Sequence, residues 1–243
     1  YMSANNFLDK GQSVLLRDRH WGPYKGFLQN NSLDYETWPI LPPNGNESHP
    51  YFARKEFESK LAELCNKQDK VMVWLNDPAH NPTGLSMSPE GRYACLESFV
   101  ESALSNPKVG HTLLIDSAYS LYADETHAWG DTIVESLADG LMWPENLFFC
   151  VAVSLSKSHT IYGLRTGALV GMHPEKEVTD RMDTILCVTA RQTWSATPRV
   201  SQYCVSEMHS SQEGGEAWSK ERDRLKNLLD TRRKILISEC EKL

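Results

Sequence analysis

Short apolar runs alternate with longer amphipathic stretches along this chain. The runs are continuously hydrophobic, which is typical of strands buried on both faces of a sheet. They lie at residues 14–16, 71–75, 112–116, 148–154 and 167–171. Apolar residues at helical spacing, with proline at two helix starts, predict helices over residues 53–65, 89–104, 132–140, 174–188, 197–208 and 217–243.

The alternation of strands and helices predicts a three-layer α/β/α fold with a mostly parallel sheet. The Gly/Pro-rich stretch at residues 39–50 predicts a surface loop, so we expect one domain over residues 1–243. Ligands of such sheets bind at the carboxyl ends of the strands. Here those ends carry Asn76, Asp116 and residues 154–157, which predicts a polar site at one edge of the sheet.

Composition and charge narrow the class of protein. The formal net charge of −7 argues against a nucleic-acid partner, and the absence of an 18-residue apolar run argues against a membrane span. Six cysteines are scattered without a CxxC pair, which favours buried, reduced thiols in a cytoplasmic protein. Eight histidines show no HxxxH or HExxH spacing, so we expect no metal. The start at Tyr1 suggests a piece of a longer chain.

The segment most indicative of a catalytic site follows the fourth apolar run. Lys157 stands in Ser-Leu-Ser-Lys, and Arg165 follows eight residues later in Arg-Thr-Gly. A lysine at the carboxyl end of a strand, flanked by hydroxyls and followed by an arginine among glycines, suits a Schiff-base lysine beside a phosphate clamp. Such a motif is short, so its meaning depends on what the rest of the chain contains.

Four other features each have a structural and a functional interpretation. The Asn81-Pro82-Thr83-Gly84 segment is a turn signal, but a cis Asn-Pro bond could also aim the Asn81 amide into a cleft. Asp116 closes an apolar strand and could cap a helix, bind a metal or meet a protonated heterocycle. Trp21 is either a core residue or a platform for an aromatic ligand. Arg191 and Trp194 are uninformative individually.

The order of these pieces distinguishes a family. Ala-His-Asn-Pro-Thr-Gly at 79–84, Asp-Ser-Ala-Tyr at 116–119, the lysine and arginine motif at 154–167 and Arg-x-Thr-Trp-Ser at 191–195 follow one another. From about residue 7 to its end, the chain resembles the fold-type I pyridoxal-phosphate-dependent aminotransferases of class I/II. Within them it resembles the aspartate and aromatic amino-acid branch.

The resemblance implies a role for each matching residue. Lys157 would bind pyridoxal phosphate covalently and carry a proton between substrate and cofactor. Asp116 would pair with the protonated ring nitrogen, so that the ring can accept electrons. Asn81 and Tyr119 would hydrogen-bond the ring oxygen, with Tyr119 assisting catalysis and Asn81 also lying beside the substrate.

The remaining implied roles concern the ring faces, the phosphate and the substrate. Trp21 and Ala118 would lie against opposite faces of the ring. Ser154 and Arg165 would hold the phosphate, since an arginine fork matches that oxyanion well. Arg191 would reach across a homodimer to the distal carboxylate of a dicarboxylic substrate.

The chain also departs from the family pattern. Arg19 stands where the family usually has a proline, and Ala196-Thr197-Pro198 replaces the usual Asn-Pro-Pro. The glycine-rich phosphate loop and the small C-terminal domain of the family have no counterpart in these 243 residues. We therefore expect the chain to be the cofactor-binding large domain of such an enzyme.

The resulting functional hypothesis is transfer of an amino group between an amino acid (aspartate, glutamate or an aromatic one) and a 2-oxo acid. Two alternatives remain open at this point. One keeps the cofactor but carries out C–S lysis or another β-elimination. The other is a fragment that binds cofactor without turnover.

Overall fold

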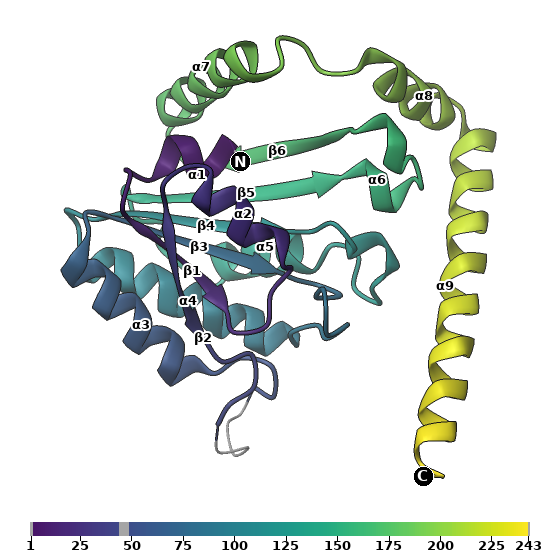
Figure 1. Cartoon of the computed structure of the whole chain (residues 1–243), viewed down its shortest axis with the longest axis horizontal. Coiled ribbons are helices and arrows are strands. Elements are labelled where there is room, and N and C mark those ends of the chain that lie inside the picture. Colours follow the sequence, from purple (N-terminus) through teal and green to yellow (C-terminus); the bar gives the residue numbers. More distant parts are fainter. Residues whose placement is uncertain (1, 44–48, 243) are drawn as a thin grey trace. The chain divides into compact units, whose positions relative to one another are not determined.

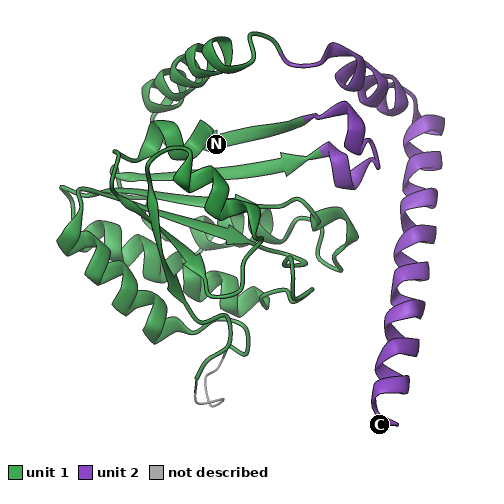
Figure 2. Cartoon of the chain, viewed as in Figure 1, with its two compact units in different colours: residues 1–154, 167–196 green, residues 155–166, 197–243 purple. Residues whose placement is uncertain are grey.

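The computed structural model describes residues 2–43 and 49–242. The chain forms two compact units, which Figure 2 distinguishes by colour. The first comprises residues 1–154 and 167–196, and the second comprises residues 155–166 and 197–243. The predicted strands all lie in the first unit.

The first unit is built on a six-stranded sheet with the order β2-β1-β3-β4-β5-β6 (Figure 1). Neighbouring strands are parallel, except that β6 runs antiparallel to β5. The strands are β1 Ser13–Arg17, β2 Asp34–Trp38, β3 Lys70–Asn76, β4 Gly110–Asp116, β5 Leu147–Ser154 and β6 Gly167–Met172. This sheet confirms the predicted α/β class and its mostly parallel strands.

Helices cover both faces of the sheet. One face packs against α3, α4 and α5, and the other packs against α1, α2 and α7. The helical elements of this unit are α1 Met2–Phe7, α2 Pro23–Gln29, α3 Arg54–Lys67, α4 Pro89–Ser105, η1 Ser120–Tyr122, α5 Ala128–Ala138 and α7 Lys176–Thr193. The three layers agree with the prediction from the sequence.

Strand β3 shows why the predicted strands are continuous apolar runs. Val71, Val73 and Leu75 belong to the core beneath α3, α4 and α5, whereas Met72 and Trp74 belong to the core on the opposite face. Successive side chains of a strand point to opposite faces, so a strand covered on both sides has no solvent-facing position to fill with a polar residue.

Two strands differ from the prediction. Strand β2 was not expected, because its sequence Asp-Tyr-Glu-Thr-Trp mixes polar and aromatic residues; it lies at the edge of the sheet, where burial is partial. The run at 167–171 was expected to be buried on both faces, but β6 is the opposite edge strand and most of its residues are exposed. Edge position explains both errors, since an edge strand needs less apolar surface.

Helix boundaries and thiol burial also require correction. Helix α7 starts at Lys176, two residues after Pro174, and α9 starts at Gln212 instead of residue 217. Residues 39–43 and 49–50 of the predicted loop form no helix or strand, and residues 44–48 lie outside the described part. The cysteines are unpaired, but Cys187, Cys204 and Cys240 are exposed, so the expectation of buried thiols was wrong for these three.

The second unit contains the lysine segment and the C-terminal helices. Its elements are α6 Leu155–Ser158, η2 Tyr162–Leu164, α8 Arg199–Ser210 and α9 Gln212–Cys240. His159 joins them, because its Nε2 lies 3.0 Å from His209 Nε2 and its ring stacks on Trp218 at 4.8 Å between centroids. In the part of the chain described, no helix combines the length and apolarity needed to cross a membrane.

Candidate active site

Asp116 is the last residue of β4, and three groups fix its position. Its backbone carbonyl accepts a hydrogen bond from Asn76 Nδ2 at 2.7 Å. The carboxylate oxygen Oδ2 accepts from the Tyr24 hydroxyl at 2.5 Å, and Oδ1 accepts from the backbone N–H of Ala118 at 3.1 Å. The aspartate that the sequence left open between a cap and a ligand-binding group is thus a half-buried carboxylate at the carboxyl edge of the sheet.

The Asn-Pro-Thr-Gly loop places Asn81 next to Tyr119. The Asn81 backbone N–H donates to Asn76 Oδ1 at 2.6 Å, and Asn81 Nδ2 donates to the Tyr119 hydroxyl at 3.3 Å. The Asn81–Pro82 peptide is cis, and Ala79 has a φ of +56°. A non-glycine residue in the left-handed region carries a local energetic cost, and such residues concentrate at functional sites.

A buried ion network beneath this loop holds it in place. Asp77 Oδ1 accepts from the Met87 backbone N–H at 2.8 Å, and Asp77 Oδ2 accepts from Trp129 Nε1 at 2.9 Å. Burial raises the pKa of Asp77, and the positive charges of Arg17 and Arg92 act in the opposite direction. The loop that carries Asn81 is therefore tied through one carboxylate to Trp129 of α5 and to Arg92 of α4, whose Nη1 lies 3.7 Å from Asp77 Oδ2.

Trp21 lies on the segment between β1 and α2, on the same side of the sheet as Tyr24. Its ring meets Tyr24 edge-on at 5.6 Å and Phe27 edge-on at 5.8 Å. The side chain is 38% exposed, so it retains accessible ring surface. A core tryptophan would be covered further, and this partial exposure is what a stacking platform requires.

In the second unit, two cations gather on one aromatic ring. Lys157 Nζ lies 4.7 Å from the centroid of Tyr162, and the guanidinium carbon of Arg165 lies 4.9 Å from it. Arg165 Nη1 also donates to the Tyr162 carbonyl at 2.7 Å, and the Arg165 backbone has a φ of +53°. The motif thus brings its lysine and arginine together as a positively charged group that suits an anionic ligand.

The other predicted residues are placed as follows. Ser154 ends β5, so it lies at the same carboxyl edge as Asn76 and Asp116. Arg191 is exposed in the last turn of α7, and Trp194 follows directly as the C-cap of that helix. Ser195 after it has a φ of +68°.

Sequence reasoning missed one residue of this site, Tyr24, and placed Asn76 at the carboxyl edge of the sheet without giving it a role. Asn76 closes β3 as Asp116 closes β4, so its position at a strand end was a usable signal. Tyr24 carried no such signal, because its hydroxyl meets Asp116 across 92 residues of sequence.

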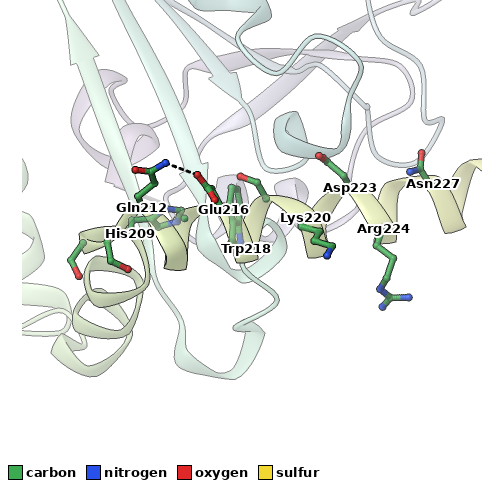
Figure 3. Close-up of a pocket in the computed structure, with 12 residues that line it drawn as sticks. His209, Gln212, Glu216, Trp218, Lys220, Asp223, Arg224 and Asn227 are labelled. Atoms are coloured by element: carbon green, nitrogen blue, oxygen red, sulfur yellow. Dashed lines mark hydrogen bonds between the residues drawn. The ribbon is translucent and has the colours of Figure 1, made fainter.

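A hollow in the second unit has a different lining. It has a volume of about 1000 Å³ and lies along the end of α8 and the first half of α9 (Figure 3). Its lining residues include His209, Trp218 and Asp223, and Gln212 donates to Glu216 at its rim. None of the residues expected from the sequence lines it. Within residues 2–43 and 49–242, no three His, Cys, Asp or Glu side chains form a group that could hold a metal ion.

Comparison with known proteins shows the family of this chain. Residues 4–243 match the family described as Aminotransferase class I and II, and the chain belongs to that family. It is 28% identical over 190 residues to an aromatic-amino-acid aminotransferase of Paracoccus denitrificans, a match that covers 77% of this chain and 44% of the relative. The chain spans about half the length of the curated relatives that it matches.

Solved structures give the same family. A crystal structure of an aminotransferase from Anaerococcus prevotii has a TM-score of 0.87 and 26% identity, covering 99% of this chain and 56% of that one. The aromatic-amino-acid aminotransferase of Burkholderia pseudomallei, which is covalently bound to pyridoxal phosphate, has a TM-score of 0.74 and 20% identity, covering 99% and 56%. The second likeness concerns the fold alone.

Proposed function

We propose that this chain is the cofactor-binding part of a pyridoxal-phosphate-dependent aminotransferase, which moves an amino group between an amino acid and a 2-oxo acid. The observation that carries the proposal is the Asp116 carboxylate, which Tyr24 and Ala118 hold at the carboxyl edge of a parallel sheet. A fixed, half-buried carboxylate at that edge is suited to pairing with a protonated ring nitrogen. Family membership supports the same assignment.

The donors in the first unit fit the polar edges of pyridoxal phosphate. Asp116 would hold the ring nitrogen, while the amide of Asn81 and the hydroxyl of Tyr119, 3.3 Å apart, would bind the ring oxygen. The half-exposed ring of Trp21 and the small side chain of Ala118 would leave room for a flat heterocycle. When bound, the cofactor supplies an electron sink for the substrate's α-carbon.

The second unit supplies the groups expected for covalent attachment and for the phosphate. Lys157 Nζ would bond to the cofactor and, once the substrate's amino group has displaced it, would carry a proton from the substrate's α-carbon to the cofactor. Arg165 would bind the phosphate by charge-assisted hydrogen bonds, and the resemblance implies the same ligand for Ser154. The shared position of Lys157 and Arg165 over the Tyr162 ring supports both roles, because it keeps two cations near one anionic ligand.

The substrate assignment rests on Arg191. Its exposed guanidinium in the last turn of α7 would bind the distal carboxylate of aspartate or glutamate in a homodimer. Aromatic amino acids are alternative donors, as the name of the Paracoccus relative indicates for that protein. We further propose that residues 1–243 correspond to the large domain and that the enzyme acts in the cytoplasm.

A single-turnover assay tests this function. The purified chain is loaded with pyridoxal phosphate and mixed with aspartate, glutamate or tyrosine, and the 2-oxo acid is measured. We expect up to one equivalent of 2-oxo acid per chain, loss of this yield in Asp116→Ala and an unchanged yield in Asp139→Ala, which alters an exposed residue at the end of α5.

The alternatives give different results in the same assay. Release of a thiol and pyruvate from a cysteine conjugate, without 2-oxo acid from the other donors, would indicate β-elimination. Cofactor binding without any product would indicate a chain that binds but does not react. Either result would contradict the aminotransferase assignment for this chain.

A further inference from the structure

A buried tyrosine meets the aspartate of the candidate site. The Tyr24 hydroxyl donates to Asp116 Oδ2 at 2.5 Å, from the second residue of α2 to the last residue of β4. Tyr24 is 6% exposed. No motif of the sequence identified this residue.

Aromatic neighbours fix the direction of the hydroxyl. The Tyr24 ring packs edge-on against Trp74 of β3 at 5.2 Å and edge-on against Trp21 at 5.6 Å. Edge-to-face pairs at these separations are favourable and define ring orientation. With the ring held on both sides, the hydroxyl is directed at the Asp116 carboxylate.

The protonation state of the phenol makes it a dependable donor. Burial, followed by the neighbouring charge of Asp116, raises the pKa of Tyr24 well above its usual value of 10.0. The hydroxyl therefore keeps its proton at neutral pH, and it can only donate to an ionised carboxylate. A hydrogen bond to the charged form of an acid favours that form.

The two carboxylate oxygens of Asp116 have different donors. Oδ2 accepts from the Tyr24 phenol and Oδ1 accepts from the Ala118 backbone N–H, so the plane of the carboxylate is set by two elements at once. The backbone donor cannot be removed by substitution, whereas the phenol can. The contribution of Tyr24 to this support can therefore be tested by substitution.

We propose that Tyr24 is a positioning residue for the reaction: it holds the Asp116 carboxylate ionised and correctly turned toward the ring nitrogen of the cofactor. The inference rests on the proposed function, because only a ligand with a protonated nitrogen makes use of this arrangement. Two residues of the segment 21–24 would then act on the cofactor ring. Trp21 would lie against its face, and Tyr24 would act on its nitrogen through Asp116.

The test compares two cofactors on three proteins. Dissociation constants of pyridoxal phosphate and of its 1-deaza analogue, in which carbon replaces the ring nitrogen, are measured by fluorescence for the wild-type chain, Tyr24→Phe and the control Tyr93→Phe. Tyr93 is a partly exposed tyrosine on α4 in the same unit. Loss of a hydrogen bond to a charged group corresponds to roughly a 10-fold to 100-fold weakening.

We expect Tyr24→Phe to weaken binding of pyridoxal phosphate by about 10-fold or more and to leave binding of the deaza analogue within about 2-fold of wild type. Tyr93→Phe should change neither. Equal weakening for both cofactors would show a merely structural role and overturn the proposal, as would no change for either. Failure of the wild-type chain to bind pyridoxal phosphate would instead contradict the proposed function itself.

A second variant covers the case in which Tyr24→Phe does not fold. Tyr24→His keeps a ring and an N–H donor, and its melting temperature is recorded together with both dissociation constants. Wild-type preference for pyridoxal phosphate over the analogue, retained in Tyr24→His, supports the proposal. Equal weakening of both cofactors in a folded Tyr24→His protein would show a merely structural role and contradict the proposal.

Discussion

Asn76 and Asp116, register partners at the ends of β3 and β4, are joined by a hydrogen bond from the Asn76 amide to the Asp116 carbonyl. The other half of the same amide, Oδ1, accepts the backbone N–H of Asn81 at 2.6 Å. One buried side chain thus fixes the backbone of both the expected nitrogen-binding carboxylate and the expected oxygen-binding amide.

We expect Asn76→Ala to lower the free energy of unfolding by about 2–4 kcal/mol, because it leaves a partly buried carbonyl and a partly buried N–H without their partner. Urea denaturation measures this change. The control Asn30→Ala, at the exposed end of α2, should shift the free energy by less than about 0.5 kcal/mol. If Asn76→Ala unfolds at the same urea concentration as the wild type, the amide of Asn76 does not stabilise the contact between the two strands.

His80 should make stability depend on pH. Burial, together with the charge of Arg17, lowers the pKa of His80 to about 4, and the ring forms a hydrogen bond with Thr83 Oγ1 at 2.8 Å. An unfolded histidine, with a pKa of about 6.5, takes up a proton earlier than the folded one as the pH falls. The contribution of neutral His80 to the free energy of unfolding is therefore fully present above about pH 6.5 and is lost as the pH falls from about 6.5 toward about 4.

The size of this effect follows from the shift in the pKa of His80. The loss approaches about 3 kcal/mol at the acid end, at 1.36 kcal/mol for each pH unit. Urea denaturation at a series of pH values, for wild type and His80→Gln, measures it. We expect the difference in free energy between the two proteins to change by about 3 kcal/mol between pH 7 and pH 4. A difference in free energy of unfolding that stays constant from pH 7 to pH 4 would contradict the lowered pKa of His80.

Gly167, the glycine of the Arg-Thr-Gly motif, has a steric reason to be glycine. A Cβ at this position would overlap the carbonyl oxygen of Val153, on the strand paired with β6. We expect Gly167→Ala to destabilise the protein by about 1–3 kcal/mol, as measured by thermal or urea unfolding. Gly163→Ala, where no atom lies within 4 Å of the added Cβ, should cost less than Gly167→Ala. Similar losses for both variants would show that this close approach is not what requires glycine.

The sequence was a good guide wherever burial was complete. The strands β1, β3, β4 and β5 are apolar because helices cover them on both faces, so their pattern alone located them. It was a poor guide at the two edges of the sheet. At these edges β2 contains several polar residues and β6 is largely exposed. Neither strand is buried along its whole length, as a continuous apolar run would imply.

Site residues divide in a similar way. Asp116, Asn81 and Lys157 were predicted as site residues because they stand in ordered motifs at or shortly after the ends of β4, β3 and β5. The support of Asp116 was not, because Tyr24 reaches it only through the docking of α2 on β3 and β4. Hydrogen bonds between residues so far apart in sequence are decided by packing, which no local pattern encodes.

The most direct test of the account is the identity of the lysine that binds the cofactor. The chain is incubated with pyridoxal phosphate, reduced with borohydride and digested, and the labelled peptide is sequenced by mass spectrometry. We expect the label on Lys157, with loss of labelling in Lys157→Arg and unchanged labelling in the control Lys176→Arg, an exposed lysine on α7. Labelling at another lysine, or undiminished labelling of Lys157→Arg, would contradict the account.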